Sequence, residues 1–501
     1  MPLFLAFALT LLAADPALAG CLAGGLDEEA CVTDSAVLGA QVASAGFFAG
    51  GKFVPEDGQA QDGFGGAVAI STDTVVVGAN GDDDNGEDSG SAYVLAKDDS
   101  GNWVLEAKLL ASDGAAFDFF GTSVAVSGDT VLVGAYWDDD NGFESGSAYV
   151  FVRDGVGNWS EQAKLLASDG ASADFFGGAV ALDGDTAVVG AIGNDSVASS
   201  AGAGYVFVRD GSGVWSEETK LVAADGAAGD FFAGSVAVDG DTVLVGALRD
   251  NDNGAVSGSV YVYLRETAGG WVQQAKLLAE DGSAHDQFSH SLGLSGNTAI
   301  VGAIGDADNG VTAGSAYVFL RDGAGVWTQQ AKLLASDGIA ADVFGRSVDV
   351  SGGLAVVGAE RDDDKGIDAG SVYLFARDAN GDWLQSSKLV GGDGTGGDHF
   401  GFSAAIDGDT TVIGADGVND RGLDSGAIYL LTLPTLSCGD ANGDGSVTAS
   451  DALFTLKAST GVVFCSTAFC DVNNDGSVTT TDALIVLQIS IGLNLQLNCP
   501  G

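Results

Sequence analysis

The sequence has few basic residues and, past its first residues, no long apolar run. Of 501 residues, 19 are Lys or Arg and 70 are Asp or Glu, which gives a formal net charge of −51. A surface this acidic repels phosphate backbones, so we exclude nucleic acid as a partner. No stretch after the N-terminal segment has the length and apolarity of a membrane-spanning helix, so no transmembrane span is expected.

Catalytic motifs are also missing. The chain has three histidines, His285, His290 and His399, and the sequence places no nucleophile or further ligand set beside them. We therefore expect structural or surface histidines rather than catalytic ones. There is no Gly-rich phosphate loop, no nucleophile elbow and no carboxylate pair in a specific context. The sequence thus predicts that the chain is not an enzyme.

The N-terminus is typical of an export signal. Residues 3–14 are apolar, and Ala17 and Ala19 provide the small side chains of a cleavage site. We expect a signal peptide over 1–20 and a linker over 21–46. The protein should therefore be secreted, extracellular or held at the cell surface.

Cys21 has two alternative fates. Residues 18–21 resemble a bacterial lipobox, which would attach a lipid anchor to Cys21. In ordinary cleavage Cys21 would instead be free to pair with Cys31. No Lys or Arg precedes the apolar run, which favours plain secretion. The six cysteines are an even number, compatible with three disulfides in an exported chain.

The chain does contain a 56-residue repeat in seven copies. High glycine (78 residues) and low proline (5 residues) fit short strands joined by tight turns. Five columns recur, each identified by its first and last member. They are the first Asp column (Asp57 to Asp393), the second Asp column (Asp62 to Asp398), the Phe column (Phe64 to Phe400), the Tyr column (Tyr93 to Tyr429) and the Trp column (Trp103 to Trp383, six members). Invariance of the Asp columns favours turn capping and blade packing over catalysis.

Each copy predicts four antiparallel strands, in the second copy 122–127, 130–135, 147–153 and 159–166. Four short strands at this period are typical of a propeller blade rather than of a β-helix. Lys52 is in register with a Lys column that runs from Lys108 to Lys388, and Phe47 stands where the Trp column would. We therefore expect a mainly β, seven-bladed propeller over 47–433, closed by an N-terminal strand. An open solenoid would need polar capping repeats, and none is present.

The motifs of the repeat resemble a known family. The Phe-Gly start, the Val-Gly-Ala end of the second strand and the Gly-Ser-Ala-Tyr-Val-Phe third strand resemble FG-GAP repeats, found in the integrin α-chain propeller and in many secreted bacterial proteins. The resemblance implies the fold and says little about function. The family's calcium loop lies between strands one and two, where this chain has only a Gly-Asp-type turn, so that calcium site is not transferred.

Acidic loops between the second and third strands are candidate Ca²⁺ sites. Carboxylates at relative positions 1, 3 and 7 around a Gly turn can converge on a hard cation. The alternative is a solvated acidic hairpin. Copies four and five keep two acids each, and copy three has lost the pattern. The candidate ligands are Asp82, Asp84, Asp88, Asp138, Asp140, Glu144, Asp362, Asp364 and Asp368.

After a linker over 434–437, residues 438–501 form a second domain. It contains two loops with EF-hand spacing, 31 residues apart, each followed by an apolar segment predicted to be helical, 451–459 and 482–491. Oxygen ligands at this spacing predict Ca²⁺ as the cofactor. The predicted ligands are Asp440, Asn442, Asp444, Ser446, Asp451, Asp471, Asn473, Asp475, Ser477 and Asp482.

The paired loops resemble a dockerin type I module. The resemblance implies one helix per calcium loop and a cohesin as partner, with Ala449, Ser450, Thr480 and Thr481 facing it. The domain departs from the family by carrying four cysteines. We expect Cys438–Cys499 to tie its ends and Cys465–Cys470 to close the connection between the repeats.

These features predict a secreted or surface-attached calcium-binding protein. Its propeller would bind an extracellular protein or glycan, as in cell adhesion, and its dockerin-like module would dock it. One alternative is a component of extracellular polysaccharide degradation of the glycosidase-complex type, although no carboxylate pair can be nominated. A further alternative is a structural component of a cell-surface layer.

Overall fold

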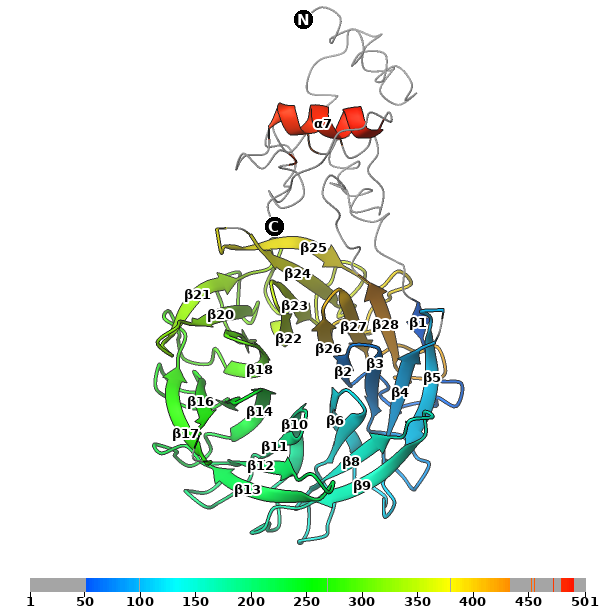
Figure 1. The fold of residues 1–501 in the computed structure, drawn as a ribbon, viewed down its shortest axis with the longest axis vertical. Coiled ribbons are helices and arrows are strands. Elements are labelled where there is room, and N and C mark those ends of the chain that lie inside the picture. Colours follow the sequence, from blue (N-terminus) through cyan, green and yellow to red (C-terminus); the bar gives the residue numbers. More distant parts are fainter. Residues whose placement is uncertain are drawn as a thin grey trace, which may run out of the picture. The chain divides into compact units, whose positions relative to one another are not determined.

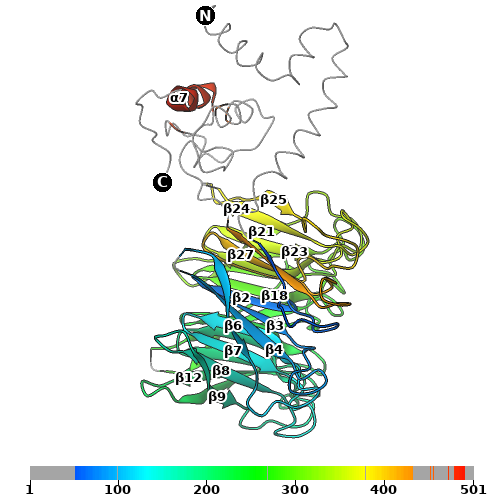
Figure 2. The same ribbon diagram turned by 90° about the vertical axis from the view of Figure 1, so that its right-hand side faces the viewer.

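The computed structural model describes residues 51–432 except 99, 268 and 379, and further along the chain residues 452, 455, 472 and 479–490. Residues 51–432 form seven four-stranded antiparallel sheets around a common axis, the seven-bladed propeller that the repeat predicts (Figure 1). Seen from the side, the strands run between the two end faces of the propeller (Figure 2).

The first four blades each run from an inner strand near the axis to an outer strand at the rim. Blade 1 is β2 (Ala67–Ser71), β3 (Thr74–Ala79), β4 (Ser91–Lys97) and β5 (Trp103–Leu109). Blade 2 is β6 (Phe120–Ser127), β7 (Thr130–Ala135), β8 (Ser147–Arg153) and β9 (Trp159–Leu165). Blade 3 is β10 (Phe176–Asp183), β11 (Thr186–Ala191), β12 (Ala203–Arg209) and β13 (Trp215–Leu221). Blade 4 is β14 (Phe232–Asp239), β15 (Thr242–Ala247), β16 (Ser259–Arg265) and β17 (Trp271–Leu277).

The remaining three blades have the same order from the axis outward. Blade 5 is β18 (Phe288–Ser295), β19 (Thr298–Ala303), β20 (Ser315–Arg321) and β21 (Trp327–Leu333). Blade 6 is β22 (Phe344–Ser351), β23 (Leu354–Ala359), β24 (Ser371–Arg377) and β25 (Trp383–Leu389). Blade 7 is β26 (Ser403–Asp407), β27 (Thr410–Ala415), β28 (Ala427–Thr432) and β1 (Lys52–Phe53). The last blade therefore combines three strands from the end of the repeat with one from its beginning.

The predicted closure of the ring is confirmed. β1 pairs antiparallel with β28, with Lys52 opposite Tyr429 and Phe53 opposite Ile428. The N-terminal strand thus covers an edge of β28 that would otherwise present unpaired backbone groups. Phe47, expected at the position of the Trp column, lies outside the described residues.

The strand bounds expected for the second copy agree with the structure to within two residues. β6 begins at Phe120, two residues before the expected start, because Phe120 pairs with Ala135 across a β-bulge that ends where Ser123 pairs with Gly134. A bulge inserts residues that alternation along a strand does not reveal. The bulged geometry places the Phe120 side chain in the core.

The core lies between neighbouring blades and repeats from blade to blade. Phe120 and Tyr149 are fully buried, and their rings meet edge to face with centroids 5.4 Å apart. The second strand of each blade is almost entirely buried, which explains its continuous apolar run. Packing of the blades at this distance requires glycine in the second strand, because a Cβ added at Gly134 would lie 1.9 Å from the carbonyl oxygen of Gly177 in the next blade.

The C-terminal region is described for one helix and a few residues near it in the sequence. Helix α7 (Thr480–Ser490) begins two residues before the expected start, because Thr479 caps it. The Thr479 Oγ1 accepts the N–H of Thr481, and the Asp482 carboxylate accepts the N–H of Thr479, as in a capping box. Buried Val486 packs in a small cluster with Ala452 and Val472.

Two further sets of expectations fall outside the described residues. They concern the export segment with Cys21 and Cys31, and the four cysteines of the C-terminal domain. Among the described residues, no helix combines the length and apolarity needed to span a membrane.

Candidate functional site

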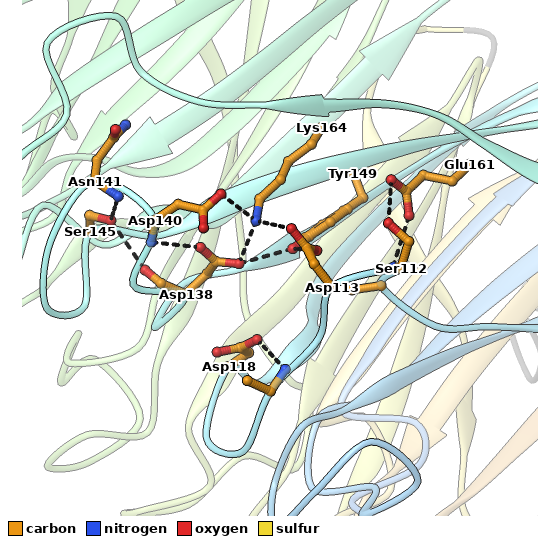
Figure 3. Close-up of polar contacts among 12 residues, drawn as sticks. Ser112, Asp113, Asp118, Asp138, Asp140, Asn141, Ser145, Tyr149, Glu161 and Lys164 are labelled. Atoms are coloured by element: carbon orange, nitrogen blue, oxygen red, sulfur yellow. Dashed lines mark hydrogen bonds and ion pairs between the residues drawn. The ribbon is translucent and has the colours of Figure 1, made fainter.

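One lysine in each blade lies at the centre of the acidic loop region. In blade 2, the Lys164 Nζ lies 2.8 Å from Asp113 Oδ2, 2.9 Å from Asp138 Oδ2 and 2.6 Å from Asp140 Oδ2 (Figure 3). The Tyr149 hydroxyl lies 2.8 Å from Asp113 and 2.9 Å from Asp138, so it bridges the same carboxylates. We call the lysine, the three carboxylates and the tyrosine, with the equivalent residues of other blades, the lysine cluster.

The lysine cluster recurs around the ring. In blades 1, 4, 5 and 6 the ammonium group also binds three carboxylates, whereas in blade 7 Lys52 binds Asp393 and Asp420. In blade 3, which lacks the acidic pattern, Lys220 binds Asp169 and the side-chain oxygens of Asn194 and Ser196. The four other triple clusters are Lys108 with Asp57, Asp82 and Asp84; Lys276 with Asp225, Asp250 and Asp252; Lys332 with Asp281, Asp306 and Asp308; and Lys388 with Asp337, Asp362 and Asp364.

The structure therefore brings together two of the three carboxylates expected in each candidate calcium loop, and their partner is a lysine. The third carboxylate belongs to Asp88, Glu144 or Asp368, each of which has a positive φ of 51° to 55°. The backbone N–H of each donates to the carboxylate of the Asp five residues earlier in the same loop, which is not one of the candidate ligands. Within the described ranges, no three His, Cys, Asp or Glu side chains are grouped so that they could hold a metal. This geometry favours an internal ion pair over a bound Ca²⁺ in the blades.

The register of the lysine is the signal that could have identified its role. Lys164 follows Asp138 by 26 residues, and the same interval separates Lys108 from Asp82 and Lys276 from Asp250. Pairing of Lys164 with Tyr149 across β8 and β9 brings the ammonium to the loop that precedes β8. Sequence reasoning used this register to close the ring and missed its electrostatic role.

The cluster shifts the pKa of its members in opposite directions. Burial alone would raise the pKa of Asp113, but the hydrogen bond and charge of Lys164 outweigh it and hold that pKa below its usual range. All seven members of the first Asp column share this direction. Burial would lower the pKa of Lys164, but its carboxylate partners raise it. The lysine therefore stays charged and neutralises buried Asp138.

The second Asp column caps a turn. The Asp118 carboxylate accepts the N–H of Ala115 at 2.7 Å, and the same bond, three residues apart, is present in all seven copies. Burial, followed by the charge of neighbouring carboxylates, raises the pKa of Asp62, Asp118 and Asp342 to about 6. These positions agree with the turn-capping role expected from invariance.

The histidines lie at or near the face that carries the acidic loops, which we call the loop face. Nε2 of His290 lies 2.8 Å from Nη1 of Arg346, and burial together with the Arg346 charge lowers the pKa of His290 to about 3. Nδ1 of His399 lies 3.1 Å from Oδ1 of Asp416, and that hydrogen bond raises the pKa of His399 against the effect of burial. A cavity of about 290 Å³ is lined by His399, Asp416, Gln61 and Asp424. His285 is exposed.

Of the predicted ligands in the C-terminal domain, Asp482 is described. Its side chain is buried in the first turn of α7, and Oδ2 accepts hydrogen bonds from the N–H and hydroxyl of Thr479. A buried carboxylate at the last position of an EF-hand-spaced loop fits a calcium ligand. The cohesin-facing residues expected on this repeat, Thr480 and Thr481, are exposed at the start of α7.

The remaining candidates of this domain lie outside the described residues. They are Asp440, Asn442, Asp444, Ser446, Asp451, Asp471, Asn473, Asp475 and Ser477, with Ala449 and Ser450 of the first cohesin-facing pair.

Comparison with known proteins identifies both parts of the chain. FG-GAP repeats match residues 49–95, 103–151, 159–207, 215–263, 271–319, 327–375 and 383–431, and a dockerin type I domain matches residues 438–489. A crystal structure of a protein from Lactobacillus plantarum is 17% identical, with a TM-score of 0.43, over 66% of this chain and 86% of that chain. No curated protein matches. The chain belongs to the FG-GAP repeat family and carries a C-terminal dockerin type I domain.

Proposed function

We propose that the protein is a non-catalytic component of an extracellular complex. Its dockerin domain would attach it to a cohesin in a Ca²⁺-dependent manner, and its propeller would bind a second extracellular partner. The observation that carries the proposal is the presence, in one chain, of a propeller closed by its own N-terminal strand and a dockerin type I domain.

The start of α7 supports the docking part. Thr480 and Thr481 are exposed, whereas Asp482 beside them is buried. If Asp482 binds Ca²⁺, the ion holds the first turn of α7 in place, because Asp482 directly follows Thr480 and Thr481 in that turn. Loss of the ion would then remove the order of the surface that presents both threonines.

The lysine cluster supports a non-catalytic propeller. A general acid or nucleophile must be free to act on a substrate. The Asp138 carboxylate is buried, and both it and the half-exposed Asp113 carboxylate are held by Lys164 and Tyr149. The second Asp column is likewise engaged by backbone N–H groups. Repeated acids of the blades therefore stabilise the fold, and recognition is left to residues that depart from the repeat.

Capture of the full-length protein on immobilised type I cohesins tests the docking part. We expect retention in Ca²⁺ and release by EDTA. Arginine at all four expected cohesin-facing positions, Ala449, Ser450, Thr480 and Thr481, should abolish retention. The control is Thr328→Arg, at an exposed position on the outer strand β21. Retention that survives EDTA, or failure with every cohesin of a broad panel, would refute the docking role.

Incubation of the same protein with a panel of polysaccharides tests the absence of catalysis. We expect no new reducing ends in any sample. Release of sugars, lost again in a variant of one carboxylate or histidine at the loop face, would replace this proposal with a hydrolase.

A further inference from the structure

The repeat provides a reference against which unusual residues stand out. Most basic residues of the propeller belong to the Lys column or to the last position of the third strand, where Arg153 and Arg209 lie. Those outside both groups are Arg249, Arg346, Arg361, Lys365 and Arg421. Each follows a second strand, lies in the connection to a third strand, or stands at the start of an inner strand, so all of them are at the loop face.

Most of these cations have no close carboxylate partner although the chain has 70 acidic residues. Among the described residues, Arg249, Lys365 and Arg421 form no ion pair, and Arg361 reaches Glu360 at 3.8 Å. The guanidinium of Arg249 instead lies over the ring of Phe231, 4.5 Å from its centroid. The exposed guanidinium of Arg249, which has no ion pair in the part of the chain that the structure describes, is available to an anionic ligand. Arg361 has only the long contact to Glu360, which pairs with Arg346 at 2.8 Å.

Arg249 and Arg361 occupy a position at which four blades have glycine, and blade 2 has Trp137 there. A Cβ added at Gly193 or Gly305 would lie 1.9 Å from a backbone carbonyl oxygen. Large side chains in blades 2, 4 and 6 therefore require a local change of the backbone. Residues that break a structural rule of their own repeat point to a function.

Trp137 lies in an aromatic group that the repeat does not require. It is the one tryptophan outside the Trp column. Its ring meets Phe119 edge to face at 4.8 Å and Tyr136 at 5.5 Å, and Tyr136 contacts Phe175 of blade 3 at 6.4 Å. Phe119 directly precedes the innermost strand β6, so the aromatic group lies toward the axis of the propeller.

Exposed carboxylates occupy the neighbouring loops. The connection from β7 to β8 presents exposed Asp139 and Asp140 beside Phe143, and the connection from β23 to β24 presents Asp363 and Asp364. Phe143 is thus an exposed apolar residue beside acids. A folded protein partner needs a contiguous apolar centre within an interface of about 1,200–2,000 Å², and the acids beside Phe143 interrupt such a centre in blade 2.

We propose that the loop face binds an acidic sugar chain, with Arg249 and Arg361 holding its carboxylates and Trp137, Tyr136 and Phe119 packing against its rings. A sugar ring presents an apolar C–H face to an aromatic side chain, and a carboxylate accepts paired hydrogen bonds from a guanidinium. The acidic surface that disfavours phosphate backbones also opposes an acidic sugar chain, so the affinity depends on these arginines and on the ring contacts. The inference rests on the proposed function and names the ligand class of the propeller.

Calorimetric titration of the full-length protein with galacturonic acid oligomers tests this inference. We expect binding that is lost when the carboxyl groups of the oligomers are methyl-esterified. Arg249→Ala and Arg361→Ala should each weaken it by about tenfold, because each removes a charge-assisted contact, and Trp137→Ala should weaken it further. The controls, Arg209→Ala and Arg321→Ala, each remove the same charge at the other end of the strands and should leave affinity unchanged.

Four results would overturn the inference. They are no binding of the acidic oligomers, equal binding of the methyl esters, equal binding of an oligoglutamate peptide, and equal weakening by the control variant. Thermal unfolding of each variant distinguishes loss of the site from loss of the fold. Cohesin capture of the same preparations separates this outcome from the docking role, which depends on the other domain.

Discussion

At the residue scale, one lysine in each blade makes the acidic repeat compatible with a folded core. The Asp138 side chain is 5% exposed, and a carboxylate buried to this extent needs a compensating charge. Lys164 supplies that charge and also lies 5.0 Å from the centre of the Tyr149 ring. The same cation connects Asp113, which follows blade 1, to the loop of blade 2. The cluster therefore joins neighbouring blades as well as neutralising them.

Replacing Lys164 with methionine should destabilise the propeller. We expect a loss of about 2–3 kcal/mol in the free energy of unfolding, below the full cost of breaking a buried pair because Asp113 and Asp140 are half exposed. Denaturant unfolding followed by tryptophan fluorescence measures it. Lys365→Met, which removes an unpaired exposed lysine, is the control. A loss below about 0.5 kcal/mol would show that Asp138 does not depend on the lysine.

Blade 3 provides a natural control for the acidic member of the pair. It has Asn194 where blade 2 has Asp138, and Lys220 still binds the side-chain oxygen of Asn194. Asp138→Asn should therefore cost no more than about 1 kcal/mol of unfolding free energy. A cost as large as that of Lys164→Met would contradict this interpretation of the cluster.

The two Asp columns predict opposite responses to pH. The first column has lowered pKa values in the folded state, so its stabilisation is lost as pH falls through those values. Asp62, Asp118 and Asp342 of the second column have pKa values raised to about 6, so their contribution is full below the usual Asp value of 3.8 and is lost as pH rises through about 6. Stability should therefore be greatest near pH 4 and should fall as pH rises through about 6.

Thermal unfolding as a function of pH measures this balance. Asp118→Asn keeps an oxygen that can accept the Ala115 N–H but does not titrate, so it should reduce the fall in melting temperature between pH 4 and pH 7. Asp129→Asn, a substitution in the exposed turn between β6 and β7, is the control. A melting temperature that rises steadily to pH 7 in the wild type would contradict the assignment.

At the element scale, glycines in the second strands set how closely the blades pack. A Cβ at Gly134 would meet the carbonyl oxygen of Gly177 at 1.9 Å, and that oxygen belongs to the backbone of the next blade. The neighbouring strand has to move if this position gains a side chain. The second strand therefore fixes the spacing of the ring, and not just the core of its own blade.

Gly134→Ala should destabilise the propeller by about 2–3 kcal/mol through overpacking. Gly155→Ala is a matched control, because a Cβ there meets nothing within 4 Å and no positive φ is involved. Denaturant unfolding of the two variants gives the difference. Equal stabilities would show that the blades can move apart at no cost.

The strands and their order could be predicted because the repeat compares the sequence with itself. Residues such as Phe120 and Tyr149 mark the same structural position in every copy, which fixes both type and register of the strands. The bulge after Phe120 could not be predicted, because it depends on the approach of the neighbouring blade. The partner of Asp138 was missed for the same reason: Lys164 reaches it through strand pairing, and 26 residues separate them in sequence.

The site at the loop face was harder to predict than the fold. Trp137, Arg249 and Arg361 are visible in the sequence as departures from a glycine column, yet nothing in the sequence shows that the glycine position is sterically closed. The structure shows that closure and the absence of an ion pair at Arg249 among the described residues. Unusual residues within a repeat therefore become informative when the packing of the usual residue is known.

At the scale of the whole molecule, the chain divides its acids between two tasks. In the propeller, loop carboxylates such as Asp82 and Asp138 are balanced by lysines. In the dockerin domain the loops at 440–451 and 471–482 have no basic residue within them, so their oxygens suit an external cation. The 70 acidic residues thus include acids compensated by lysines in the blades, exposed acids around them and a small set that we propose binds Ca²⁺.

The number of Ca²⁺ ions bound by the full-length chain tests this division most directly. Equilibrium dialysis followed by atomic emission should find two ions per chain, one for each EF-hand-spaced loop. Asp444→Asn with Asp475→Asn should abolish both, whereas Asp138→Asn with Asp362→Asn should abolish neither. More than two ions, with the excess lost in the blade variant, would show that the acidic loops of the propeller hold Ca²⁺ in place of lysine and would contradict the account.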